Sequence, residues 1–113
     1  MSYYLLYPET GRPPLPTEKP ANVIAVYRGS QYIDAVLWSR LKAIWEYAPR
    51  SAAAILYHPE DKYDQSTERV DRSTAERAAP AFAATPLPTE DELAAMCQEG
   101  RRILMNNQQQ TTT

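Results

Sequence analysis

The chain contains one histidine and one cysteine, the residue types best suited to act as a general base or a thiol nucleophile. His58 lies in the segment HPEDKYD near Glu60, Asp61 and Asp64, and such a cluster could bind a hard cation or support acid–base chemistry. The spacing matches no metal-binding motif, and loops rich in Asp and Glu are usually solvated. Cys97 has apolar neighbours at helical spacing rather than the electropositive setting of a reactive thiolate. We therefore expect no enzymatic activity, no metal and no cofactor. If the chain were an enzyme, His58 would be its base.

Three consecutive acidic residues, Glu90, Asp91 and Glu92, could suggest a metal-binding cluster, but helix capping accounts for them. Thr89 can accept a hydrogen bond from the amide of Glu92, whose side chain can reach back to the amide of Thr89. Carboxylates also stabilise the positive end of a helix dipole. The pattern predicts a C-terminal helix over residues 89–106.

One face of this C-terminal helix is apolar and is expected to be buried within the domain or against another copy of the chain. The face comprises Leu93, Met96, Cys97, Gly100, Ile103 and Leu104. Gly100 either allows a neighbouring element to approach closely or simply weakens the helix by about 1 kcal/mol. Residues 107–113 are polar and are expected to form a disordered tail.

Trp38 and Trp45, seven residues apart, are the strongest indication of an interaction surface in the sequence. Apolar residues recur at helical spacing over residues 31–48, which predicts a helix; the alternative is a turn at Gly29-Ser30, a strand over 31–37 and a shorter helix from Ser39. On the long helix, both indoles either cover the sheet or form an exposed ridge for another protein, with Trp38 the more exposed. Trp and Arg dominate interface hot spots. The expected partner-binding residues are Trp38, Arg40, Leu41, Trp45, Leu93, Met96 and Ile103.

An alternative surface combines tyrosines with arginine on the expected strands. Such side chains could stack with the bases of a single-stranded nucleic acid, and the residues concerned are Tyr4, Tyr27, Arg28 and Tyr32. The isoelectric point near 5.4 argues against this class, because duplex-binding domains usually lie above about 9.

The order of the expected elements predicts an α+β fold: a small sheet of about three strands, one main helix packed on it and a second, C-terminal helix. Strands are predicted over residues 3–7, 22–28 and 51–57 from their aromatic and aliphatic residues. The helix over 31–48 would join the last two as parallel neighbours. The expected division is a small α/β core over residues 1–63, a charged arm and Ala/Pro-rich tether over 64–88, the C-terminal helix of the same domain over 89–106, and the tail.

Length, charge and cysteine content exclude several further classes of protein. The chain has 113 residues and a net charge of −2, and its longest apolar runs fall short of the roughly 18 residues of a membrane span. Its first residues lack the basic region of a signal peptide, and a single cysteine allows no internal disulfide. These features favour a small cytoplasmic interaction protein, an adaptor, regulator or inhibitor of a larger complex, of bacterial or phage origin. Its expected partner is another protein; homodimerisation through the C-terminal helix or a sheet edge is also considered, and no membrane is expected.

Overall fold

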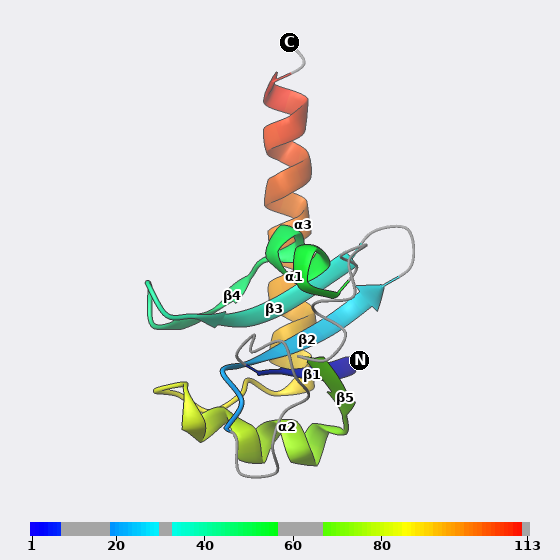
Figure 1. The fold of residues 1–113 in the computed structure, drawn as a ribbon. Coiled ribbons are helices and arrows are strands. Elements are labelled where there is room, and N and C mark those ends of the chain that lie inside the picture. Colours follow the sequence, from blue (N-terminus) through cyan, green and yellow to red (C-terminus); the bar gives the residue numbers. More distant parts are fainter. Residues whose placement is uncertain (8–18, 30–32, 57–66, 112–113) are drawn as a thin grey trace.

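A five-stranded antiparallel sheet forms the centre of the protein in the computed structural model (Figure 1), which describes residues 1–7, 19–29, 33–56 and 67–111. The strand order is β4-β3-β2-β1-β5. The strands are β1 (Ser2–Leu6), β2 (Asn22–Gly29), β3 (Ile33–Ser39), β4 (Ile44–Tyr47) and β5 (Thr67–Val70). The helices are α1 (Pro49–Leu56), α2 (Arg72–Ala78), the short 3-10 helix η2 (Ala79–Ala81) and α3 (Glu90–Thr111). The α+β class is confirmed, while the expected number of strands was too low.

The sheet carries a hydrophobic core on each face. Along β2, Val23 and Ala25 face the larger core while Ile24 and Val26 face the smaller one. In Figure 1, α3 runs behind the sheet and α1 lies in front of it, with α2 below. Helix α3 contributes Leu93 and Cys97 to the larger core. A strand buried on both faces reads as a continuous apolar run, as β2 does.

The helix predicted over residues 31–48 is wrong, because β3 and β4 form a hairpin there. The alternative strand over 31–37 agrees with β3, but its helix from Ser39 does not form. Trp38 and Trp45 are direct cross-strand partners, with ring centroids 5.4 Å apart in an edge-to-face arrangement. Since β3 is apolar on both faces, its sequence lacks the alternation that would distinguish a strand from a buried helix.

The strand predicted over residues 51–57 is also wrong, because Pro49–Leu56 forms α1. Proline at the first helical position and the alanines that follow favour this helix, and Ala52 is fully buried in the smaller core. The expected strand–helix–strand unit with parallel strands is therefore absent from the described residues, where every strand pair is antiparallel.

The expected arm and tether over residues 64–88 instead pack on the sheet where they are described. Strand β5 pairs with β1, and α2 starts at Asp71, whose side chain accepts a hydrogen bond of 2.8 Å from the amide of Thr74. Ala79 and Leu87 are buried in the larger core. Small apolar side chains can fill a core that larger ones already frame, so an Ala/Pro-rich composition did not indicate a free linker.

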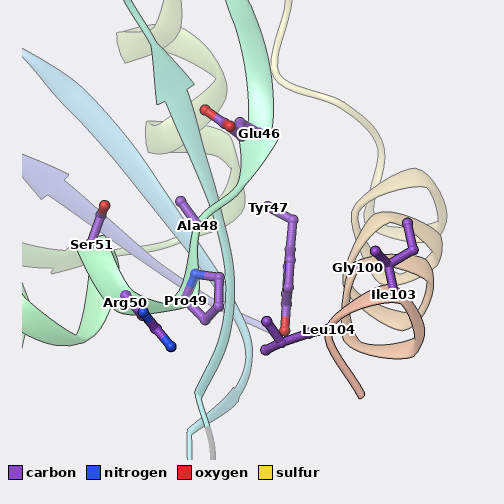
Figure 2. Close-up of a pocket in the computed structure, with 9 residues that line it drawn as sticks. All are labelled: Glu46, Tyr47, Ala48, Pro49, Arg50, Ser51, Gly100, Ile103 and Leu104. Carbon is purple, nitrogen blue, oxygen red and sulfur yellow. The ribbon is translucent and has the colours of Figure 1, made fainter. Parts of the chain in front are cut away.

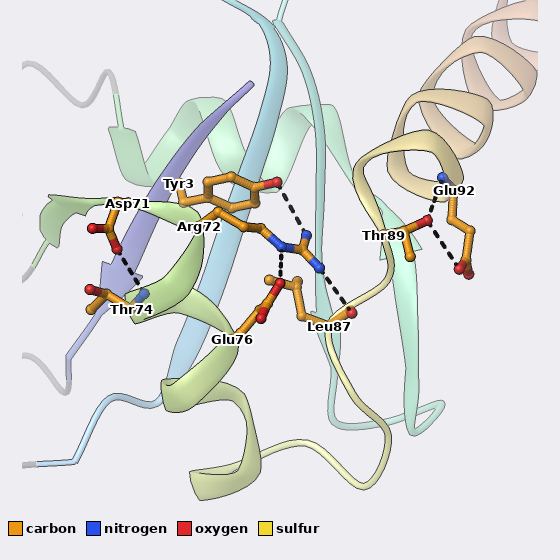
Figure 3. Close-up of polar contacts among 8 residues, drawn as sticks. All are labelled: Tyr3, Asp71, Arg72, Thr74, Glu76, Leu87, Thr89 and Glu92. Carbon is orange, nitrogen blue, oxygen red and sulfur yellow. Dashed lines mark hydrogen bonds and ion pairs between the residues drawn. The ribbon is translucent and has the colours of Figure 1, made fainter.

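Arg72 joins three elements at the lower edge of the sheet (Figure 3). Its guanidinium donates to Glu76 at 2.6 Å, to the Tyr3 hydroxyl at 3.2 Å and to the Leu87 carbonyl at 3.4 Å, and it lies 5.5 Å from the centre of the Tyr3 ring. Because forked donors can satisfy several acceptors at once, this one side chain holds α2, β1 and the segment before α3 together.

The predicted start of the C-terminal helix is confirmed. The hydroxyl of Thr89 accepts from the amide of Glu92 at 3.2 Å, as predicted, and donates to the Glu92 carboxylate at 3.1 Å (Figure 3). The Glu92 side chain therefore meets the hydroxyl of Thr89 rather than its amide, which the pattern had predicted. The helix continues to Thr111, past the predicted end at residue 106 and through most of the predicted tail. Leu93 and Cys97 are buried as expected.

Candidate protein-interaction site

The C-terminal half of α3 extends beyond the sheet (Figure 1). With 22 residues, the helix is about 33 Å long at 1.5 Å per residue. In its early turns Leu93 and Cys97 are buried, but three consecutive large apolar residues further on are exposed: Ile103 at 47%, Leu104 at 38% and Met105 at 52%. Single exposed apolar residues are ordinary, whereas a group of them on a projecting helix is a candidate contact surface.

A groove of about 480 Å³ separates α3 from the junction between β4 and α1 (Figure 2). Its lining comprises Glu46, Tyr47, Ala48, Pro49, Arg50, Ser51, Gly100, Ile103 and Leu104. Ile103 and Leu104 therefore belong both to the projecting helix and to the groove. We refer to this site as the α3 groove.

Gly100 sets the distance between α3 and β4. A Cβ atom added at Gly100 would lie 2.5 Å from Cγ of Tyr47 and closer still to Cδ2. No side chain fits at that position unless Tyr47 or the helix moves. Figure 2 shows the Tyr47 ring standing between the strand and the helix. Of the two interpretations of Gly100, close approach of a neighbouring element is the one that the structure supports.

A buried carboxylate fixes both walls of the α3 groove. Asp34, on β3, is 3% exposed; it accepts a hydrogen bond of 2.7 Å from the Tyr47 hydroxyl and pairs with Arg101 at 3.1 Å. Burial and the Asp34 carboxylate raise the pKa of the Tyr47 hydroxyl, so Tyr47 stays neutral and acts as a donor. Because buried charges are retained only when paired, this network fixes the position of α3 on the sheet.

Sequence reasoning missed Asp34 as a site residue. The available signal was a single acidic residue within the apolar run YIDAVLW, which calls for a buried partner if the run is a core strand. Burial, and after it the Asp34 carboxylate, also raises the pKa of the Cys97 thiol to about 11. At neutral pH this thiol is protonated, which agrees with the expectation of a packed rather than a reactive cysteine.

Charge at the α3 groove is unevenly distributed. The carboxylate of Glu46 pairs with Lys42 at 2.7 Å, whereas Arg50 is exposed and makes no hydrogen bond or ion pair within the part of the chain that the structure describes. Arg50 and Ser51 stand in the first turn of α1, where the helix dipole adds positive partial charge. The groove thus combines apolar walls with an available cation.

The predicted partner-binding residues do not form one surface in the structure. Trp38 and Trp45 are buried, at 4% and 8% exposure, so the expected exposed ridge is wrong, as is the expectation that Trp38 would be the more exposed of the two. Trp45 also donates from its indole N–H to the carbonyl of Thr85 at 3.4 Å. Both tryptophans belong to the larger core, where the Trp45 ring also meets the Phe82 ring edge-to-face, with centroids 6.1 Å apart.

The other predicted residues lie in three places. Arg40 and Leu41 are at the tip of the β3–β4 hairpin, where Leu41 is 95% exposed. Leu93 is fully buried and Met96 packs against the larger core. Of the whole predicted set, Ile103 alone lines the α3 groove.

The tyrosine platform is not assembled in the described residues. Tyr4 packs against the smaller core and Tyr27 against the larger one, on opposite faces of the sheet, so the two cannot share one stacking surface. The side chain of Arg28, and Tyr32 and His58, lie outside the described part of the chain.

Within the described residues, no group of three His, Cys, Asp or Glu side chains is placed to hold a metal ion. None of the described helices is long and apolar enough to cross a membrane. No protein-family model, curated protein or solved structure matches the chain.

Proposed function

We propose that the protein is a non-enzymatic interaction module that binds a protein partner through the α3 groove and the apolar residues of the projecting helix beside it. As such a module it would act as an adaptor, regulator or inhibitor of a larger complex in the cytoplasm. The observation that carries the proposal is the exposure of Ile103 and Leu104 beside a groove.

Energetics favour this use of the projecting helix. Complete burial of a fully exposed Leu or Ile side chain contributes about 1.5–3 kcal/mol. Because Ile103 and Leu104 are 47% and 38% exposed, a partner that covers them would gain somewhat under half of that amount at each position. A helix end without tertiary packing is marginal in water, so α3 gains order as well as burial when a partner covers it.

The test is affinity capture from the native host with three forms of the tagged protein. The double variant Ile103→Gln/Leu104→Gln alters the groove wall, while Leu41→Gln removes an equally apolar and more exposed residue at the hairpin tip. We expect the wild type and Leu41→Gln to retain the same partner and the double variant to lose it. Thermal melting must show that all three are folded. Equal capture by all three forms, or none by the wild type, would contradict the proposal.

The single-strand nucleic-acid alternative is not proposed. It required one face shared by the tyrosines, and Tyr4 and Tyr27 lie on opposite faces.

A further inference from the structure

We infer that the α3 groove recognises an acidic peptide segment, in which an apolar side chain enters the groove and a neighbouring Asp or Glu pairs with Arg50. This inference rests on the proposed function and adds the chemistry of the partner. It follows from the walls of the groove, from the charge left available there, and from the charges that accompany the chain's own apolar residues.

The walls of the groove suit an apolar side chain rather than a polar one. Pro49 and Tyr47 form one side, and Ile103 and Leu104 the other (Figure 2). The Tyr47 hydroxyl is already committed to Asp34, so it offers the groove mainly its ring. A volume of about 480 Å³ lies within the range of sites that enclose small ligands or a few side chains.

The available charge at the groove is positive. Lys42 neutralises Glu46, and the carboxylate of Asp34 is shared between Tyr47 and Arg101. Arg50 makes no such contact among the described residues, and it stands in the first turn of α1, where the helix dipole also favours an anion. A carboxylate next to the apolar anchor would meet a forked donor at the rim of the groove.

The same charge disfavours a second copy of this chain as the occupant. Leu41, the most exposed large apolar residue among those described, stands between Arg40 and Lys42. The apolar run that begins at Ile103 directly follows Arg101 and Arg102. Of these cations, Lys42, Arg101 and Arg102 are already paired with Glu46, Asp34 and Glu99. Arg40 would therefore bring an uncompensated like charge toward Arg50, and neither segment offers Arg50 a free carboxylate. An acidic partner avoids that repulsion.

The inference is tested by selection from a phage-displayed library of random linear peptides. The immobilised targets are the wild type, Arg50→Glu and the matched control Arg40→Glu, which reverses a charge at the distant hairpin tip. We expect peptides selected on the wild type and on Arg40→Glu to combine aromatic or aliphatic residues with Asp or Glu. Arg50→Glu should select Lys or Arg instead.

One selected peptide, labelled with a fluorophore, then provides affinities. Reversing the Arg50 charge should weaken its binding about tenfold, the size expected when an attractive rim contact becomes repulsive, and Arg40→Glu should leave it unchanged. Three outcomes would overturn the inference: peptides selected on the wild type are not enriched in acidic residues, peptides selected on Arg50→Glu are still enriched in them, or no peptide is selected at all.

Two further measurements separate this inference from the proposed function. If selected peptides lack acidic residues but still lose binding to Ile103→Gln/Leu104→Gln, the groove remains an interaction site and the acidic preference falls. If they bind that double variant as well as the wild type, both fall. A labelled oligothymidylate that displaces the peptide, or a dimer in sedimentation that Arg50→Glu dissociates, would assign Arg50 to another occupant and overturn the inference.

Discussion

Replacing Gly100 by alanine gives the sharpest test of how α3 is seated, because two opposing effects act at that position. In a helix interior, alanine is favoured over glycine by about 1 kcal/mol, so propensity alone would make Gly100→Ala stabilising. The added Cβ, however, would lie 2.5 Å from Cγ of Tyr47 and closer to Cδ2. The sign of the change in stability therefore reports whether the close contact exists.

We expect the steric cost to exceed the gain in propensity. Overpacking typically costs about 1–3 kcal/mol, and Tyr47 cannot easily move, because its ring belongs to a paired strand and its hydroxyl is hydrogen-bonded to Asp34. The upper part of that range applies, so the net loss in the free energy of unfolding should be about 1–2 kcal/mol. The helix would have to retreat from β4, which would also lengthen the contact between Arg101 and Asp34.

Urea denaturation of a double-mutant cycle measures the effect. In a Tyr47→Ala background the ring is gone, and Gly100→Ala should then stabilise the protein by about 1 kcal/mol. The coupling energy of the cycle should be about 2–3 kcal/mol. As a matched control, Ala95→Gly at an exposed position of α3 should cost about 1 kcal/mol. A Gly100→Ala protein as stable as the wild type, with no coupling to Tyr47, would refute the reasoning.

Three further predictions concern the core and the helix start. Trp38→Ala and Trp45→Ala should each cost about 3–5 kcal/mol, whereas Leu41→Ala should stay within about 0.5 kcal/mol; a Trp38→Ala protein that melts like the wild type would contradict the buried pair. Thr89→Ala should lower the free energy of unfolding in urea by about 1 kcal/mol, and no change would argue against the capping box. Because the pKa of Cys97 is raised from 9.0 to about 11 in the folded state, the unfolded state loses its proton first. The free energy of unfolding should therefore fall between pH 9 and 11, and an identical slope in Cys97→Ala would contradict this.

The C-terminal helix was predictable because its signals are local. The capping box at Thr89, the acidic first turn and the apolar stripe depend on residues within a few positions of one another. The continuation to Thr111 was not predictable in this way, since the sequence after Asn106 is polar and has no apolar periodicity. Helix length there follows from propagation of a helix that is already nucleated and packed.

The β3–β4 hairpin was not predictable from periodicity. A helix and a pair of strands both place the same apolar residues on a buried face, so the pattern does not distinguish the two interpretations. Trp38 and Trp45 share a face at seven-residue spacing in a helix, and they also share a face as cross-strand partners. The choice between the two depends on pairing with β2, which is contact at long sequence separation. The turn itself includes Ala43 at φ 55°. This left-handed conformation is uncommon for residues other than glycine, so an alanine gives no signal for a turn here.

The candidate site shows why the location of an interaction surface was harder to predict than its existence. The surplus of large apolar side chains indicated a contact surface, to which the sequence pattern assigned Trp38 and Trp45. A small domain has little core volume, and both tryptophans are used to fill the larger core. The exposed apolar residues that line the groove are instead aliphatic, Ile103 and Leu104, and they are exposed because α3 extends beyond the sheet that it covers. What assembles them into a groove is Asp34, which holds Tyr47 from one side and Arg101 from the other. A buried ion pair of this kind adds little net stability. Its consequence here is positional, because Asp34 links Tyr47 on β4 to Arg101 on α3. Removing one partner of a buried pair leaves the other uncompensated, so Asp34→Asn should lower the free energy of unfolding in urea and also weaken partner binding. An Asp34→Asn protein as stable as the wild type, with unchanged binding, would contradict this role of Asp34.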